Sequence, residues 1–199
     1  MKTLILSIAM LLGTSCVEAQ SETVHPETLP ELVRERRSIR RYTDEKIDRR
    51  ILEDLVQVGM FAPSSYGQNP VEFVVVEDRA KLAAVARAKR IGAPSVRAAA
   101  AAVVVVVDTE KGELWVEDAS VAAGYILLAA EHYGLGACWN QIRGRDGQRL
   151  SAEQEIRDIL GIPSRYAVLC VIALGHKAEE KPPHTEKELD KGRIHFEIF

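Results

Sequence analysis

The run Ala101–Val107 constrains the fold more than any other stretch of this 199-residue chain. It holds only alanine and valine, and the β-branched side chain of valine favours extended backbone. No polar residue interrupts the run, so neither face of such a strand suits contact with water. We therefore expect a strand that is buried on both of its faces.

Helical and strand patterns alternate along the rest of the chain, which contains no internal repeat. Further strands are expected at 72–77 and 168–174, and the segment 134–142 is expected to run from a loop into a strand. Helices are expected at 29–35, from 48 to near 61, after Asp78, at 95–100, from Glu117 or Asp118 to Gly134, and from the capping box at Ser151 to Gly161. The alternation predicts one domain that mixes helices and strands.

Composition restricts the function more than the fold. The chain has a net charge of −3 with 28% charged residues, so a general affinity for nucleic acid is not expected. Its histidines lack the spacing of a metal site. Cys138 and Cys170 lie in separate apolar stretches without a C-x-x-C pattern, so we expect two buried free thiols.

The first residues resemble an export signal, because a lysine precedes an apolar run that is too short to span a bilayer. Simple cleavage would make residues 1–19 a signal peptide, whereas lipidation of Cys16 would remove residues 1–15 and anchor the chain. Residues 20–28 are then a flexible leader before a domain at 29–199, and no transmembrane helix is expected in the mature chain. The expected location is the periplasm or a lipid anchor, or the cytoplasm if the start is misassigned.

A local basic cluster comprises Arg36, Arg37, Ser38, Arg40 and Arg41. Arginine presents a rigid fork of donors that matches the oxygens of a phosphate group, and serine adds a hydroxyl. The same arginines would also suit the negative end of the preceding helix or a solvated surface. From these residues alone both interpretations remain open.

Two further segments carry groups that suit a flat heteroaromatic ligand. The loop 62–70 supplies hydroxyls, a carboxamide and turn-forming residues. The segment 134–141 adds glycines that allow close backbone approach and the large ring of Trp139. No G-x-G-x-x-G joins a strand to a helix, so a Rossmann nucleotide site is not expected.

In their order and spacing these segments resemble the FMN-dependent nitroreductase family. The residues that carry the resemblance are Arg-Arg-Ser-Ile-Arg at 36–40, Ala-Pro-Ser-Ser at 62–65 with Asn69-Pro70, Gly-Leu-Gly at 134–136 and Leu-Gly at 160–161. Each motif is weak alone, but the ordered combination is more specific and spans residues 29–181.

The resemblance implies an α+β fold with a mixed central sheet flanked by helices, and an intertwined homodimer with FMN at the subunit interface. Carried over by motif, the residues that bind FMN are Arg36, Arg37, Ser38 and Arg40 at the phosphate and ribityl chain; Ser64, Ser65 and Asn69 in a loop from the second subunit; and Trp139, Asn140 and Gln141 along the isoalloxazine edge. A basic residue of the C-terminal tail often joins the phosphate site in this family, and the candidates are Lys181, His184 and Lys187. Residues that differ from the usual family pattern are Gly67, Asn69, Val71 and Tyr125, which leaves the substrate pocket undefined.

The implied activity is hydride transfer from NADH or NADPH through FMN to a small electron-poor acceptor such as a nitroaromatic or a quinone. The flavin would carry this chemistry, so no catalytic side chain is required. Export leaves two alternatives open, because nicotinamide cofactors are scarce outside the cytoplasm. They are an exported protein that binds a flavin or another phosphorylated ligand without turnover, and a flavoenzyme with a different electron donor.

The polar C-terminal arm 175–199 ends in a short alternation of apolar and polar residues. Ile194, Phe196 and Ile198 alternate with His195 and Glu197, which suits an edge strand or an arm laid on a neighbouring subunit. A frayed chain end is the other interpretation.

Overall fold

The computed structural model describes residues 28–199. The helices are α1 (Leu29–Glu35), α2 (Arg49–Met60), α3 (Arg79–Ala88), α4 (Pro94–Ala98), α5 (Trp115–His132) and α6 (Ala152–Leu160). The strands are β1 (Val71–Val76), β2 (Ala101–Asp108), β3 (Leu135–Gln141) and β4 (Tyr166–His176), and short 3₁₀ turns are η1 (Ser65–Gly67), η2 (Glu186–Glu188) and η3 (Lys191–Arg193). The expected signal peptide 1–19, the candidate lipid anchor Cys16 and the leader as far as residue 27 lie outside the described residues.

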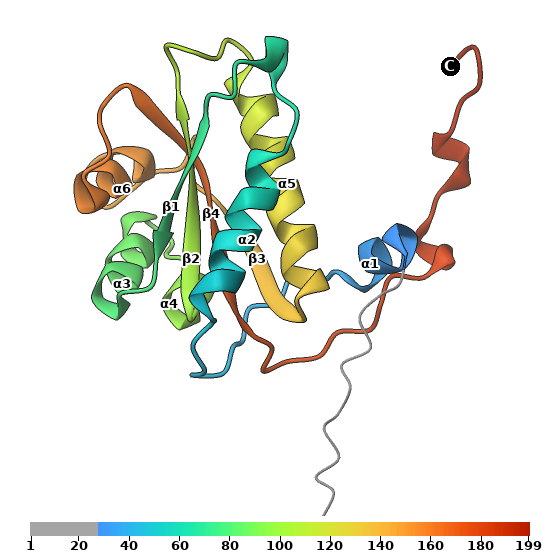
Figure 1. Cartoon of the computed structure of the whole chain (residues 1–199), viewed down its shortest axis with the longest axis horizontal. Coiled ribbons are helices and arrows are strands. Elements are labelled where there is room, and N and C mark those ends of the chain that lie inside the picture. Colours follow the sequence, from blue (N-terminus) through green and yellow to red (C-terminus); the bar gives the residue numbers. More distant parts are fainter. Residues whose placement is uncertain (1–27) are drawn as a thin grey trace, which may run out of the picture.

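The strands form one sheet in the order β1-β2-β4-β3, with every neighbouring pair antiparallel (Figure 1). All residues of β2 are buried, as the unbroken apolar run predicted. The α+β class is therefore confirmed. The expected mixed sheet also requires parallel pairing. Among residues 28–199 the parallel pairing is a single bridge, between Ser38 and Ala137 beside β3.

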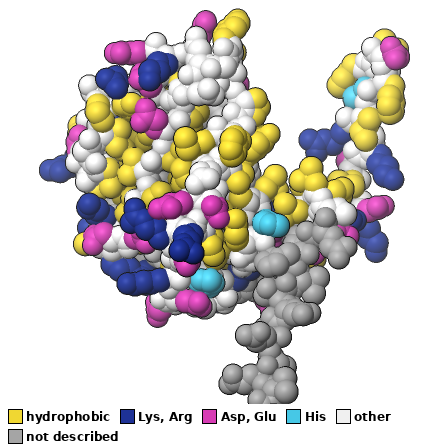
Figure 2. All heavy atoms as spheres, viewed as in Figure 1, with side chains coloured by type: hydrophobic (Ala, Val, Ile, Leu, Met, Phe, Trp, Pro, Cys, Tyr) yellow, Lys and Arg dark blue, Asp and Glu magenta, His cyan; other side chains and the backbone are white. Residues whose placement is uncertain are grey.

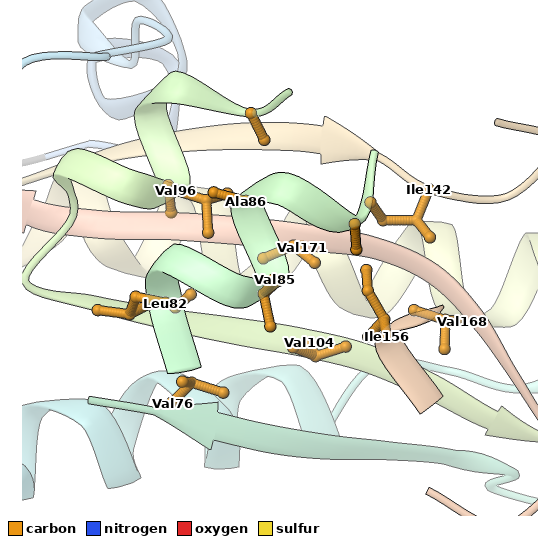
Figure 3. Packing of buried hydrophobic residues seen from close by; sticks show 14 of the residues in the cluster. Val76, Leu82, Val85, Ala86, Val96, Val104, Ile142, Ile156, Val168 and Val171 are labelled. Atoms are coloured by element: carbon orange, nitrogen blue, oxygen red, sulfur yellow. The ribbon is translucent and has the colours of Figure 1, made fainter. Parts of the chain in front are cut away.

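Helices cover both faces of the sheet, and alternate residues of β2 pack against opposite layers. Val104 and Val106 join the core under α3, α4 and α6, which is shown from close by in Figure 3. Val103 and Val105 join the core under α2 and α5. Fully burying one such side chain contributes roughly 1.5–3 kcal/mol, so a charged residue at any of these positions would break the core.

The starts of three helices follow the predicted caps. Asp48 accepts from the backbone N–H of Arg50, Asp78 from that of Lys81, and the Ser151 hydroxyl from the N–H of Gln154. The predicted capping box at Ser151 is only half formed, because the Gln154 side chain bonds to other residues of α6.

The predicted start of α5 was too late. The helix begins at Trp115 after the N-cap Leu114, which makes no side-chain capping bond. Asp118 was one of the two residues expected to start the helix, but it lies in the first turn and its carboxylate accepts hydrogen bonds from Ser65 in another loop. A contact with a distant loop thus uses the carboxylate that the local sequence had placed at the start of the helix.

Beyond β4 the chain leaves the body of the domain. The expected arm 175–199 begins inside the sheet, because Gly175 and His176 still belong to β4 and pair with β3. The chain after β4 passes α1 and ends far from the sheet, with hydrophobic side chains on its surface (Figures 1 and 2). The alternation at 194–198 does not form a strand with any of residues 28–199. Among these residues, none of the helices combines the length and apolar character needed to cross a membrane.

Candidate functional site

The arginine segment runs along the free edge of β3. The Ile39 N–H donates to the Ala137 carbonyl at 3.0 Å, next to the Ser38–Ala137 bridge. A Cβ at Gly136 would lie 2.7 Å from the Ile39 side chain, so glycine permits this approach. The Gly-Leu-Gly motif therefore has a local physical reason, because it lets the basic segment lie against the sheet.

The C-terminal tail lies beside this segment and brings another cation to it. The Ala178 N–H donates to the Arg41 carbonyl at 3.0 Å, and the His184 N–H donates to the Arg34 carbonyl at 2.9 Å. Between these points the Lys181 ammonium donates to the Ser38 carbonyl. Of the three candidate tail residues, Lys181 is therefore the one whose side chain contacts the predicted phosphate segment.

Arg36, Arg37, Arg40 and Lys181 give this place an excess of positive charge. Arg37 donates to the Pro182 carbonyl, and Arg40 Nη1 donates to the Ser38 carbonyl at 3.2 Å. Arg36 has no carboxylate partner among residues 28–199, and neither the Arg36 guanidinium nor the Ser38 hydroxyl makes a hydrogen bond there. Free donors of this kind suit a phosphate group.

The Glu179 carboxylate borders the cluster. Glu179 Oε1 accepts from the Arg40 backbone N–H at 2.6 Å and lies 3.6 Å from the Lys181 ammonium. The hydrogen bond from Arg40 and the nearby charge of Lys181 lower the pKa of Glu179. Glu179 therefore stays ionised and holds the basic segment and the tail together.

The predicted loop from Ser64 to Asn69 is held by its own side chains. The Ser64 hydroxyl donates to Asn69 Oδ1 at 3.0 Å and accepts from the Asn69 N–H at 2.9 Å. Tyr66 and Asn69 have left-handed backbone, with φ of 54° and 46°. Tyr66 is 91% exposed, so the structure gives its side chain no packing role within residues 28–199.

Asp118 anchors this loop, and sequence reasoning missed its role. Its Oδ1 accepts from the Ser65 N–H at 2.8 Å and from the Ser65 hydroxyl at 3.0 Å. The residue is only 5% exposed, and Oδ2 has no hydrogen-bond partner among residues 28–199. A cavity of about 100 Å³ adjoins it, lined also by Ser64 and Asn69. The signal in the sequence is a carboxylate on the apolar face of a helix, four residues before the buried Ala122.

Trp139, Asn140 and Gln141 do not share one face of β3. The Trp139 Nε1–H donates to Gln141 Oε1 at 3.0 Å, and the Trp139 ring packs with the core under α2 and α5. The Asn140 side chain accepts from the Ser95 hydroxyl of α4 at 2.9 Å, on the opposite side of the sheet. Because side chains alternate along a strand, Trp139 and Gln141 form one group and Asn140 is separate.

Arg143 extends the Trp139–Gln141 group and was also missed. Its carbonyl accepts from Gln141 Nε2 at 3.0 Å, and its guanidinium lies 5.5 Å from the centre of the Trp115 ring. This distance permits a cation–π contact. The group therefore lies at the start of α5, close to where Asp118 holds the serine loop.

A single chain does not bring all the predicted residues together. The serine loop lies at the start of α5, whereas the arginine segment lies near α1, toward the other end of α5 (Figure 1). Trp139 and Gln141 lie between them along β3. The arrangement offers a cationic site at one end and a hydroxyl-rich loop at the other.

The model of the nitroreductase family matches residues 33–118 and 96–176, which together make up more than half of the chain. The chain belongs to the nitroreductase family. An Archaeoglobus fulgidus protein, provisionally named an NADH dehydrogenase/NAD(P)H nitroreductase, is 35% identical over 167 residues, covering 81% of this chain and 93% of its own. A Thermus thermophilus NADH dehydrogenase is 29% identical over 193 residues, covering 78% of this chain and 90% of its own.

Solved structures of nitroreductases share the fold. The structure of an FMN-dependent nitroreductase from Clostridium difficile R20291 superposes with a TM-score of 0.83 at 38% identity, covering 86% of this chain and all of that one (100%). The nitroreductase family predicted from the ordered motifs is thus confirmed. The two cysteines of the described domain are free and buried, also as predicted.

Proposed function

We propose that this chain is an FMN-dependent oxidoreductase that uses NADH or NADPH to reduce a small electron-poor acceptor, such as a nitroaromatic or a quinone. The observation that carries the proposal is the contact of Arg40 and Lys181 with the Ser38 carbonyl at the edge of β3, in a segment that also contains Arg36 and Arg37. The similar proteins named as an FMN-dependent nitroreductase and an NADH dehydrogenase support the same chemistry.

The residues at the edge of β3 fit the phosphate of FMN. The Arg36 guanidinium and the Ser38 hydroxyl, which have no partner among residues 28–199, offer donors, and Lys181 adds a compact charge at the Ser38 carbonyl. Glu179 limits the local repulsion between the cations without occupying Arg36. An anionic group placed here would gain charge-assisted hydrogen bonds from both the basic segment and the tail.

When bound, FMN supplies the redox chemistry by accepting a hydride from the nicotinamide and passing reducing equivalents to the acceptor. The residues of the protein bind FMN and orient it. Ser64, Ser65 and Asn69 present hydroxyl and amide groups that suit the edge of a heteroaromatic ring, and Asp118 fixes their loop. Trp139 and Gln141 offer an indole and a carboxamide on one face of β3. The Asn140 side chain points to α4, so we assign it a supporting role through Ser95.

The proposed site is completed by a second subunit. In one chain the serine loop and the arginine segment lie toward opposite ends of α5, so one flavin would take its phosphate ligands from one protomer and the loop from its partner. A homodimer is typical of the family and supplies this pairing.

We further propose that the N-terminal signal directs export of the protein.

The absorption spectrum of the purified protein tests the cofactor. We expect the bands of an oxidised flavin, release of FMN on denaturation, and bleaching when NADH or NADPH is added without oxygen. Steady-state rates with a quinone should follow ping-pong kinetics, because donor and acceptor would use the same place in turn.

Each other result points to a different protein. Bound FMN that neither nicotinamide reduces would contradict the proposed donor and favour a different electron donor or a binding function without turnover. Protein that neither contains nor rebinds FMN would contradict the whole proposal.

A further inference from the structure

The stretch from Arg79 to Val107 contains no aspartate or glutamate, although the whole chain has 29 acidic and 26 basic residues. Its charged residues are all basic, namely Arg79, Lys81, Arg87, Lys89, Arg90 and Arg97. The stretch covers α3, α4 and most of β2, and α3 and α4 lie on the side of the sheet away from α5 (Figure 1). The positive charge here is therefore separate from the arginine segment beside β3.

The end of α3 and the start of α4 border an open hollow of about 380 Å³. Arg87 and Arg90 line it from α3 and the turn that follows, and Arg97 lines it from α4. The buried Ala86 and Ala93 also line it. Pockets for small ligands measure about 300–1,000 Å³, so the hollow is large enough for a compact molecule.

Two of these arginines have no carboxylate to neutralise them. Arg90 pairs with Asp146 at 2.7 Å, but Arg87 and Arg97 form no ion pair among residues 28–199. They come from different helices and border the same hollow. Two unpaired guanidinium groups around one hollow suit a ligand with two anionic groups.

The backbone carbonyls at the end of α3 would repel an anion, because they form the negative end of the helix. Gln148 offsets this effect. Its Nε2 donates to the Arg87 carbonyl at 2.9 Å and lies 3.4 Å from the carbonyls of Lys89 and Arg90. A neutral donor thus covers the carbonyl groups beside the arginines.

We propose that this hollow binds two phosphate groups, at a site separate from the proposed flavin site. Arg87 and Arg97 each contact one phosphate, and Arg90 stays paired with Asp146. The phosphates belong either to a free soluble molecule or to lipid headgroups at a membrane surface. The proposal does not depend on the proposed redox activity.

Inorganic pyrophosphate is the first probe, measured by isothermal titration calorimetry on the purified protein with its cofactor and at constant ionic strength. We expect saturable binding that Arg87→Gln/Arg97→Gln weakens about tenfold or more, as loss of charge-assisted contacts would cause. The matched control is Arg50→Gln/Lys81→Gln, which removes the same charge from α2 and the other end of α3. The affinity of this control variant for pyrophosphate should equal that of the unchanged protein.

Failure to bind pyrophosphate at millimolar concentration, together with failure of the vesicle experiment below, would overturn the proposal. Equal pyrophosphate affinity in the hollow variant and its control would also overturn it. So would loss of FMN from the hollow variant, because the site would then not be separate from the flavin.

Vesicles distinguish the two sources of phosphate. Phosphatidylglycerol vesicles are compared with phosphatidylcholine vesicles by co-sedimentation. Binding to the anionic vesicles that Arg87→Gln/Arg97→Gln abolishes would identify headgroups as the ligand, whereas pyrophosphate binding without vesicle binding would identify a soluble ligand. Vesicle binding that the hollow variant retains would assign lipid binding elsewhere and count against the hollow.

Discussion

The charge on single residues beside β3 leads to the first prediction. Arg36→Ala and Arg40→Ala should each weaken FMN binding, because each removes a cation from the proposed phosphate site. A hydrogen bond to a charged group contributes roughly 1.5–3 kcal/mol, or about tenfold or more in affinity. Fluorescence titration of the apoprotein with FMN measures the effect.

Arg41→Ala is the matched control, since Arg41 belongs to the same cluster and is exposed but is not one of the residues assigned to the FMN phosphate. Unchanged FMN affinity in the Arg36 and Arg40 variants would show that the cluster is a solvated surface and does not bind the FMN phosphate.

A buried carboxylate leads to the second residue-scale prediction. Asp118→Ala leaves two donors of Ser65 without their acceptor, so unfolding in urea should cost roughly 1–3 kcal/mol less than in the unchanged protein. Amide hydrogen exchange at 64–69 should also become faster. Asp118→Asn keeps one acceptor oxygen and should lose less on both measures. Exchange rates in the loop that stay the same in Asp118→Ala would show that Ser64 and Asn69 suffice to hold it.

The lowered pKa of Glu179 predicts a pH-dependent stability. The folded state binds fewer protons than the unfolded state, whose Glu179 titrates near the ordinary value of 4.5. The stabilisation is therefore complete above that value and is lost as the pH falls through the lowered pKa of the folded state. The difference in unfolding free energy between the unchanged protein and Glu179→Gln should accordingly shrink as the pH falls below 4.5.

Urea unfolding over a series of pH values tests this, with Glu180→Gln as a control at the exposed neighbouring position. A difference that stays constant over the acid range would mean that the Arg40–Glu179 contact does not form in solution.

At the scale of elements, local chemistry located most of the helices and strands. Asp48 and Asp78 began helices as predicted because their carboxylates meet the N–H groups of the next turn. The start of α5 was wrong because Asp118 serves a loop more than fifty positions away in the sequence. The family resemblance grouped Asn140 with Trp139, although the two face opposite sides of β3. Local sequence patterns carry no information about contacts between distant segments.

The pairing of the basic segment with β3 gives an element-scale prediction. Gly136→Ala places a methyl group against Ile39 and Lys177, so the segment must move away from the strand. We expect a lower midpoint of thermal unfolding and weaker FMN binding in the same variant. Circular dichroism verifies that the helices and strands remain, and normal FMN binding in Gly136→Ala would show that the segment is not held by this contact.

At the scale of the whole molecule, the sequence predicted the central buried strand but not the strand order. Val104 and its neighbours require cover on both faces, and that requirement follows from their side chains alone. The order β1-β2-β4-β3 depends on pairings between distant segments, which periodicity does not encode. FMN was predicted from the resemblance to a family. Local patterns could not join the groups around Ser38 and Ser65 into one site, because these groups lie far apart in one chain.

The exposed arm predicts an obligate homodimer. Phe196 and Ile198 are 82% and 81% exposed, and Ile194 and Leu189 are also largely exposed. Side chains of this size gain free energy when they pack on an apolar surface, and on α5 Val121 and Tyr125 are exposed as well. We expect the arm to pack on a second copy of the chain and to stabilise the interface at which the flavin site is completed.

Truncation after Lys187 tests this role of the arm. It removes the exposed apolar side chains of Leu189, Ile194, Phe196, Ile198 and Phe199. It keeps Lys181 at the phosphate segment, so any loss of FMN reports on assembly rather than on the phosphate contact. We expect the truncated protein to dissociate more readily in sedimentation equilibrium and to bind FMN more weakly, with FMN in turn favouring the dimer in the full chain. Substituting Phe196 and Ile198 by serine, with the arm otherwise complete, should shift both measures in the same direction. A full-length monomer that binds FMN tightly at micromolar protein would exclude the shared site, because both groups of ligands would then have to meet within one chain.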